Sequence, residues 1–139
     1  MRIQRFEDIK AWQEARILVN QIYSIVRTLP SFTREYRFRD QITSSAISIM
    51  ANIAEGFSRR SNKEFIQFLF IAKGSAAELQ SHHYIANDQN MIDGSKFNEM
   101  FKQIDKTARL ISSFITYLLN NPQTQKNSTN ATNPTNSTN

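Results

Sequence analysis

Residues 44–56 read SSAISIMANIAEG. Ala46, Ile49 and Ile53 recur within this stretch every three or four positions, which is the spacing of one face of an α-helix. Further apolar side chains beside that stripe widen it, as expected of a helix that packs against a second neighbour. Gly56 stands near the expected end of the helix, where a glycine can adopt a positive φ. The segment therefore predicts a largely buried helix.

A polar face runs along the same segment, because its members stand three or four positions apart: Ser44, Ser48, Asn52 and Glu55. Two interpretations are open. The face is either solvated or part of a buried polar network that Lys73, Ser75 and Glu78 of the next helix complete. Small residues such as Ala51 and Gly74 gather on both helices, which would let the two helices approach closely or let another subunit pack there.

The same apolar period extends outward along the chain. The 139 residues include only 3 Gly and 3 Pro, and this shortage of chain breakers favours long helices over a many-turned β fold. We predict an all-α fold, an antiparallel up-down-up-down four-helix bundle over residues 1–121. The other helical stripes span residues 6–29, 65–85 (with Ile85 inward) and 97–118, and the second helix starts its own stripe at Tyr36.

Helix starts are marked by residues that can cap. Ser31 or Thr33 would cap the second helix after the stop at Leu29-Pro30. Ser61 and Glu64 have the spacing of a capping box at the start of the third. Ser95 would cap the fourth.

The ends of the chain predict no membrane anchor and no folded extension. Residues 122–139 are almost free of apolar side chains and predict a disordered Asn/Thr/Ser-rich tail, in which three glycosylation sequons arise from composition alone. No stretch approaches ~18 uninterrupted apolar residues, and the N-terminus has no apolar signal-peptide region. With no cysteine, a cytoplasmic protein is the default expectation.

Chemistry-bearing motifs are scarce. His82 and His83 are neighbours on one predicted helix and point about 100° apart, so they cannot ligate one metal together without distortion. Glu78 lies one turn before His82, but this Glu-x-x-x-His spacing occurs once and is not that of a di-iron bundle. No Gly-x-Ser-x-Gly or phosphate-binding loop is present. We predict no enzyme activity, no metal and no cofactor.

Several motifs together indicate one family. The motifs are Phe6-x-Asp8-x-x-x-Trp12-x-x-Ala15, Leu29-Pro30, Asp40-Gln41-Ile42, Ala46-Ile47-Ser48-Ile49-x-x-Asn52-Ile53-Ala54-Glu55-Gly56-Phe57-x-Arg59-Arg60-Ser61 and Glu64-Phe65-x-x-Phe68-Leu69-x-x-Ala72-x-Gly74-Ser75-x-x-Glu78-Leu79. They resemble those of four-helix-bundle proteins encoded in intervening sequences of bacterial 23S ribosomal RNA genes, a family that includes accessory variability determinants of diversity-generating retroelements. The resemblance covers roughly residues 6–118 and implies a homopentameric ring with a basic surface; the retroelement members assist a reverse transcriptase and bind nucleic acid.

The sequence also departs from that pattern. Thr43, Ser44 and Ser45 occupy a stretch in which family members commonly have an arginine pair, and Met50 stands where a proline often follows Ser-Ile. The missing pair weakens a cationic helix face on which nucleic acid could lie.

The remaining basic residues are expected in two groups at opposite ends of the bundle. The net charge is +5, so a ring of five chains would carry five times +5, or +25, and would attract polyanions in a salt-dependent way. Two functions are open: a nucleic-acid-binding accessory oligomer that assists a reverse transcriptase, or a protein-only adaptor ring. The predicted phosphate contacts are Arg34, Arg37, Arg39, Arg59, Arg60 and Lys63. The predicted structural or subunit-contact residues are Ser48, Asn52, Glu55, Gly56, Gly74, Ser75 and Glu78.

Overall fold

The computed structural model describes residues 2–122, and most of the predicted tail lies outside the described residues. All the regular secondary structure within that range is helical, which confirms the predicted all-α fold. A single 3₁₀ turn (η1) precedes one short helix and four long ones. The elements are η1 (Phe6–Asp8), α1 (Lys10–Thr28), α2 (Pro30–Arg34), α3 (Tyr36–Phe57), α4 (Asn62–Asp88) and α5 (Gly94–Asn120).

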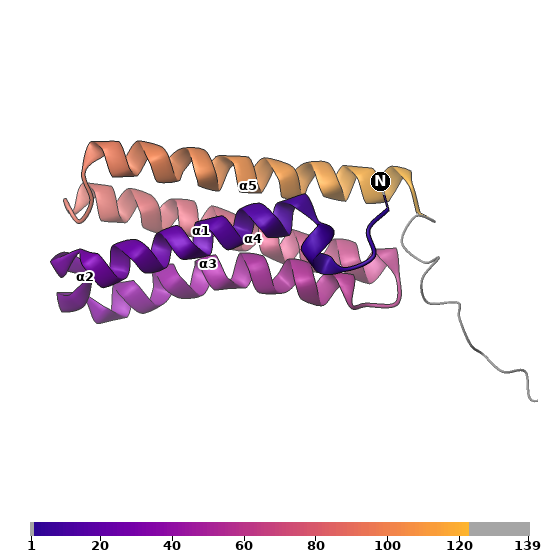
Figure 1. The fold of residues 1–139 in the computed structure, drawn as a ribbon, viewed down its shortest axis with the longest axis horizontal. Helices are drawn as coiled ribbons and strands as arrows, with labels where there is room; N and C mark the ends of the chain where they lie inside the picture. The colour runs from indigo at the N-terminus through magenta and orange to yellow at the C-terminus, as the bar shows by residue number, and fades with distance from the viewer. Residues whose placement is uncertain (1, 123–139) are drawn as a thin grey trace, which may run out of the picture.

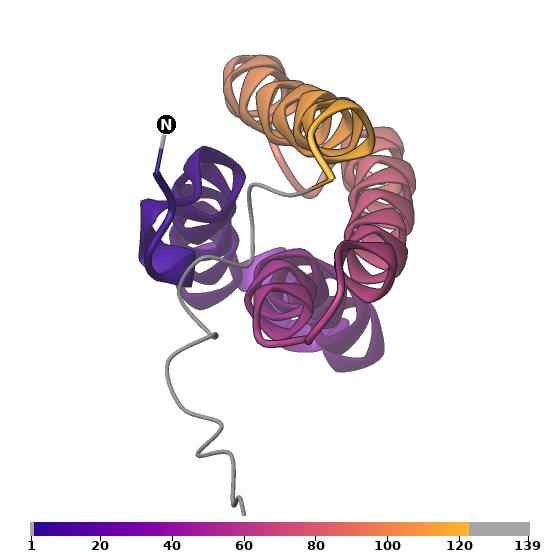
Figure 2. The same cartoon turned by 90° about the vertical axis from the view of Figure 1, so that its right-hand side faces the viewer.

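The four long helices lie side by side with each one in contact with two others (Figure 1). Around the bundle the order of contacts is α1, α3, α4, α5 and back to α1, as the end-on view in Figure 2 shows. The α3–α4 connection lies at the same end as the N-terminus, and α2 and the α4–α5 connection lie at the opposite end (Figure 1). None of the helices within residues 2–122 is long and apolar enough to span a membrane.

The core follows the predicted stripes with two exceptions, and Ile47, which was expected to widen the second stripe, is 41% exposed. Leu18, Ile49 and Leu69 are among the side chains with no exposed surface, one from each of three long helices. Tyr36 is 56% exposed and Ile85 is 43% exposed, so the prediction that both face inward is wrong. Tyr36 is the first residue of α3, and Ile85 lies on the outer side of α4, two residues from His83, which is buried against α5.

The predicted capping residue is confirmed at the start of one helix and differs at the starts of two others. The Ser61 hydroxyl accepts from the Glu64 amide at 3.2 Å, which is one of the two bonds of the capping box predicted for α4. No side chain caps α3, since Pro30 instead begins the separate short helix α2, and the Ser31 hydroxyl donates to the Met91 carbonyl. At α5 the cap is Asp93, which accepts from the Lys96 amide at 2.7 Å.

Gly56 is required for space and not for its backbone angle. It lies within α3 and its φ is not positive, so the prediction of a glycine-type helix end is wrong. A Cβ at this position would stand 2.7 Å from both Phe65 Cδ2 and Phe68 Cβ. Only glycine fits there unless α3 and α4 separate.

Candidate nucleic-acid interface and partner surface

The predicted phosphate-contacting residues form two clusters at opposite ends of the bundle. The "α2 cluster" comprises Arg34, Arg37 and Arg39, at the end of α2 and the start of α3. The "loop cluster" comprises Arg59, Arg60 and Lys63, around the α3–α4 connection. Because α3 has 22 residues, the clusters are about 33 Å apart along its axis. One chain therefore does not combine the six residues into a single surface.

Carboxylates partly neutralise each cluster. Arg39 lies 3.6 Å from the Asp40 carboxylate. Arg59 donates to Glu55 Oε1 at 2.9 Å, and its guanidinium also lies over the Phe68 ring, 4.7 Å from the centroid. The other four cations are exposed and make no ion pair with any residue in the described part of the chain, and so keep their full charge for a polyanion: Arg34, Arg37, Arg60 and Lys63.

A cleft adjoins the α2 cluster and adds a cation that the sequence did not single out. The cleft has a volume of about 490 Å³ and is lined by Arg27, Thr28, Thr33 and Arg34 together with the apolar chain turn between them. Arg27 lies over the Tyr23 ring at 5.0 Å and makes no ion pair within residues 2–122. Two guanidinium groups and the Thr33 hydroxyl on one concavity suit the oxygens of a phosphodiester, whereas the Thr28 hydroxyl already donates to the Ser24 carbonyl at 2.7 Å. Only a three-dimensional arrangement that joins α1 and α2 reveals this, because Arg27 belongs to the preceding helix.

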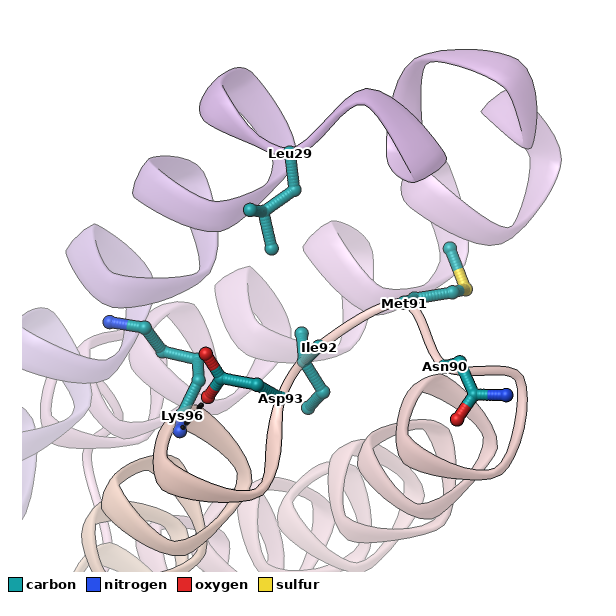
Figure 3. A pocket seen from close by; sticks show the side chains of 6 residues that line it. All are labelled: Leu29, Asn90, Met91, Ile92, Asp93 and Lys96. Carbon is teal, nitrogen blue, oxygen red and sulfur yellow. Dashed lines mark hydrogen bonds between the residues drawn. The ribbon is translucent and has the colours of Figure 1, made fainter.

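A second cleft, of about 370 Å³, lies on the other side of Leu29 (Figure 3). Leu29 points from the α1–α2 junction toward Ile92 of the α4–α5 connection, and Asp93 stands beside Ile92. Lys96 is also on its wall, and its ammonium lies 3.3 Å from Glu99 Oε2. The apolar floor and the carboxylate of Asp93 make this cleft less suited to an anion than the one beside Arg27.

The polar face of α3 meets α4 as a small, half-buried network. The hydroxyls of Ser48 and Ser75 lie 2.8 Å apart, and the Asn52 amide donates to both the carbonyl and the hydroxyl of Ser48. Ser44 and Glu55 at the ends of the face are exposed. The structure thus combines the two open interpretations: a buried centre and solvated ends.

Only one of the three proposed α4 partners joins that network. Ser75 does so, whereas Glu78 lies 3.2 Å from His82 Nε2, and Lys73 is exposed. Gly74 also differs from Gly56, because a Cβ built on Gly74 would meet no atom within 4 Å. Gly74 therefore does not help α3 and α4 approach each other.

The two histidines have different surroundings. His83 is 1% exposed, and its ring stacks on Phe97 with the centroids 4.3 Å apart. Its Nε2 lies 2.8 Å from the Phe97 carbonyl, which only an Nε2–H can bond, and its buried Nδ1 has no partner within the described residues. Burial lowers the pKa of His83, and the hydrogen bond to Phe97 opposes this in part. His83 is thus a neutral side chain joining α4 to α5.

A buried carboxylate joins α1 to α5, and no pattern in the sequence predicted it. Glu14 is 5% exposed, and Gln103 donates from Nε2 to its carboxylate at 2.8 Å and to its carbonyl at 3.0 Å. Lys106 lies 3.1 Å from the same carboxylate. The Gln103 hydrogen bond, and then Lys106, lower the pKa of Glu14 although burial opposes them. Glu14 is therefore an ionised contact within the bundle.

Apolar side chains are exposed along the outer face of α4. Phe70 is 53% exposed and Ile71 is 52% exposed, and Tyr84 and Ile85 follow near the other end of the helix. Helix α4 is apolar on more than the face that the bundle covers, so its apolar period could not show which residues stay outside. Such a surface is typical of a protein–protein contact.

Comparisons with known proteins agree with the fold. A structure described as a protein of unknown function from the S23 ribosomal protein family of Bacteroides thetaiotaomicron superposes with a TM-score of 0.71 at 23% sequence identity, covering 76% of this chain and 97% of the other. No curated protein sequence matches the chain. Residues 7–113 match the 23S rRNA-intervening sequence protein family, which is most of the chain. The chain belongs to the 23S rRNA-intervening sequence protein family.

Proposed function

We propose that the chain is a non-enzymatic, homo-oligomeric accessory protein that binds nucleic acid through phosphate contacts and assists a reverse transcriptase. The homo-oligomer, with a pentamer as its expected state, comes from the family resemblance. The observation that carries the nucleic-acid contact is the group of exposed cations without a carboxylate partner within residues 2–122. Arg27, Arg34 and Arg37 form this group at the α2 end of the bundle.

The α2 end supports the contact better than the loop end. Arg27 and Arg34 line one cleft with the Thr33 hydroxyl, whereas Arg60 and Lys63 lie on an open connection. Arg59 of the loop cluster is already paired with Glu55. Guanidinium groups and hydroxyls that converge on a concave surface position a sugar–phosphate backbone without reading bases. The protein is therefore expected to bind structured RNA or duplex DNA with little sequence preference.

A gel-shift titration tests this contact. At about 50 mM salt the wild-type protein should shift structured RNA or duplex DNA, and the shift should disappear at moderate salt because counterion release drives the binding. Arg34→Gln/Arg37→Gln should weaken the shift strongly. The matched control is Arg109→Gln, which removes an exposed α5 arginine that already donates to Asp105 at 2.8 Å. No shift by the wild-type protein at about 50 mM salt would contradict the proposal.

The alternative is a protein-only adaptor ring, and the exposed apolar residues of α4 favour it. Phe70 and Ile71 offer a surface that a partner protein could cover. Pull-down from cells after nuclease treatment separates the two functions. A partner such as a reverse transcriptase that stays bound without nucleic acid supports the adaptor, and a partner that is lost with nuclease supports the nucleic-acid accessory.

A further inference from the structure

Tyr36 is an exposed aromatic residue in the middle of the α2 cluster. It is the first residue of α3 and is 56% exposed, and Arg34 and Arg37 stand two residues before it and one residue after it. Within residues 2–122 its ring stacks on no other aromatic ring and lies under no cation. By contrast, the exposed Tyr84 packs against Phe97 with the ring centroids 5.5 Å apart. The Tyr36 ring is therefore available to a ligand.

Helix geometry places Tyr36 on the side of the bundle formed by α1 and α3. Ser48 faces α4, since its hydroxyl lies 2.8 Å from that of Ser75. Met50, two residues later, is about 200° away around the helix and packs against the core, so it marks the side of α3 that faces α1. Tyr36 stands fourteen residues before Met50 and therefore lies within about 40° of the same side.

Arg27 lies on the same side at the same end of the bundle. Glu14 of α1 faces α5, where Gln103 donates to its carboxylate at 2.8 Å. Arg27 stands thirteen residues after Glu14, about 140° around the helix from it, and so lies on the side of α1 that faces α3. Helix α2 joins the end of α1 to the start of α3, and Arg27 and Arg34 line a cleft beside it. Tyr36 thus extends the surface on which the proposed phosphate contacts lie.

The two sides of this end of the bundle have opposite charge. On the α1–α3 side, residues 27–40 contain four arginines and two carboxylates, a net charge of +2. On the α4–α5 side, residues 86–99 contain one lysine and three carboxylates, a net charge of −2. Of the two carboxylates on the α1–α3 side, Asp40 lies 3.6 Å from Arg39, and Glu35 is exposed beside Tyr36. A polyanion at this end is therefore directed to the side on which Tyr36 lies.

A tyrosine ring among arginines suits an unpaired base. Exposed aromatic side chains stack on the bases of single strands, and the contact tolerates any sequence because every base has a π-face. Inside a duplex both faces of a base are covered by its neighbours, so Tyr36 can stack only on a base of a free strand or of an unpaired loop. The Cα atoms of Arg34 and Arg37 lie within about 8 Å of the Tyr36 Cα along the chain. Both guanidinium groups can therefore reach the phosphates that flank such a base.

From this arrangement we infer that Tyr36 stacks on an unpaired base and that the α2 end binds single-stranded nucleic acid in preference to a duplex. The inference rests on the nucleic-acid binding of the proposed function and names the class of strand that is bound. Charge alone predicts the opposite order, because a duplex has the higher charge density and releases more counterions for each contact. A preference for the single strand therefore reports the contact with the Tyr36 ring and not the contacts with the arginines.

Three DNA probes test the inference by fluorescence anisotropy at about 50 mM salt. They are a single strand of about 12 nucleotides, the duplex that it forms with its complement, and an abasic strand of the same length. The wild-type protein should bind the single strand more tightly than the other two probes. Tyr36→Leu, which keeps an apolar side chain but removes the ring, should weaken binding of the single strand about 5-fold or more, the effect of losing one stacked base, and should leave binding of the other probes unchanged.

Two further variants identify the ring as the cause. Tyr36→Phe restores the ring without the hydroxyl and should restore binding of the single strand. Tyr84→Leu is the matched control, since it removes an exposed tyrosine from the α4–α5 side of the same end, and it should bind all three probes as the wild type does. All these positions are exposed, so each variant should fold, as circular dichroism would show.

The outcomes separate a wrong stacking residue from a wrong function. If the wild type binds the duplex or the abasic strand as tightly as the single strand, or if Tyr36→Leu binds the single strand as the wild type does, the inference is overturned and the phosphate contact stands. Equal losses for single strand and duplex in Tyr36→Leu also overturn it, as does an equal loss in Tyr36→Phe or Tyr84→Leu. If the wild type binds none of the probes, the nucleic-acid binding of the proposed function fails and the inference fails with it.

Discussion

At the residue scale, Gly56 controls how closely α3 and α4 pack. A Cβ there would lie 2.7 Å from Phe68 Cβ, an atom at the root of its side chain that cannot rotate away. Gly56→Ala should therefore destabilise the bundle by about 1–3 kcal/mol despite alanine's better helix propensity, because overpacking outweighs it. Urea unfolding measures this. Gly94→Ala, whose Cβ would enter open space, should change stability by less than about 0.5 kcal/mol, and an equal loss in both variants would contradict the steric explanation.

The neutral state of His83 makes stability depend on pH. Protonation would place an N–H on the buried Nδ1, which has no acceptor among the described residues, and burial already lowers the pKa of His83. As the pH falls through about 6.5, His83 takes up a proton in the unfolded chain before it does so in the folded chain. The stability that neutral His83 contributes above that pH is therefore lost as the pH falls toward the folded-state pKa of His83.

Thermal unfolding at pH 7.5 and 5.5 checks this prediction. The wild type should lose stability on acidification with a slope of at most about 1.4 kcal/mol per pH unit from this one group. His83→Gln should flatten the slope while its amide keeps a donor for the Phe97 carbonyl. His82→Gln is the control, since it leaves His83 in place, and a slope that survives in His83→Gln would assign the effect to another group.

At the scale of elements, polar contacts decide which helices are neighbours. Gln103 and Lys106 of α5 surround the Glu14 carboxylate of α1. Gln103→Ala should cost about 1–3 kcal/mol at pH 7, because it leaves a buried carboxylate with fewer hydrogen bonds. Arg109→Ala, which removes an exposed i,i+4 pair with Asp105, should cost less than about 0.5 kcal/mol.

The Glu14 contact also has a pH window of its own. The pKa of Glu14 in the folded chain is lower than its ordinary value of about 4.5. The Glu14 carboxylate therefore stabilises the fold above about pH 4.5, and this stabilisation is lost as the pH falls through the lowered pKa. Gln103→Ala removes the largest cause of that lowering. The difference in stability between wild type and Gln103→Ala, measured by urea unfolding, should therefore shrink between pH 6 and pH 3. A difference that is constant with pH would mean that Gln103 acts by packing alone.

The helices were predictable because each long one has an apolar period that the bundle buries. The first residues of the helices were less predictable. Asp93 and Ser95 are both residue types that cap helices, and only the path of the chain shows that Asp93 caps α5. Tyr36 is the first residue of α3, and Ile85 points to the outer side of α4 although His83 and Ala86 beside it are buried. The Glu14–Gln103 contact joins residues 89 positions apart, and no local pattern reveals such a pair.

The positions of the two basic clusters in the candidate site were predictable from the order of the helices. The order of the helices was enough to place the two basic clusters at opposite ends, because connections alternate between the ends of a bundle. Arg27 was missed because its place beside Arg34 depends on the turn at Leu29-Pro30. The exposure of Phe70 was not visible in the sequence, since α4 is apolar on both its inner and its outer face.

At the scale of the whole molecule, the separation of the clusters limits how nucleic acid can bind. About 33 Å divides them along α3, so they lie at opposite ends of the bundle. One duplex lying across one end of the bundle would contact only one cluster. The proposed function places that contact at the α2 end, beside the cleft of Arg27 and Arg34.

The salt dependence of binding can identify which end of the bundle contacts nucleic acid. Each phosphate contact adds about 0.9 to the slope of log K against log salt for duplex DNA. Arg34→Gln/Arg37→Gln should lower that slope by about 1.8 for each chain in contact, whereas Arg60→Gln/Lys63→Gln should leave it nearly unchanged. Both slopes can be measured by the fluorescence anisotropy of a labelled duplex at about 50 to 200 mM salt, where binding that depends on counterion release changes steeply. Equal decreases in the two double variants would show that both ends of the bundle touch nucleic acid, and a decrease in the second alone would place the contact at the α3–α4 connection.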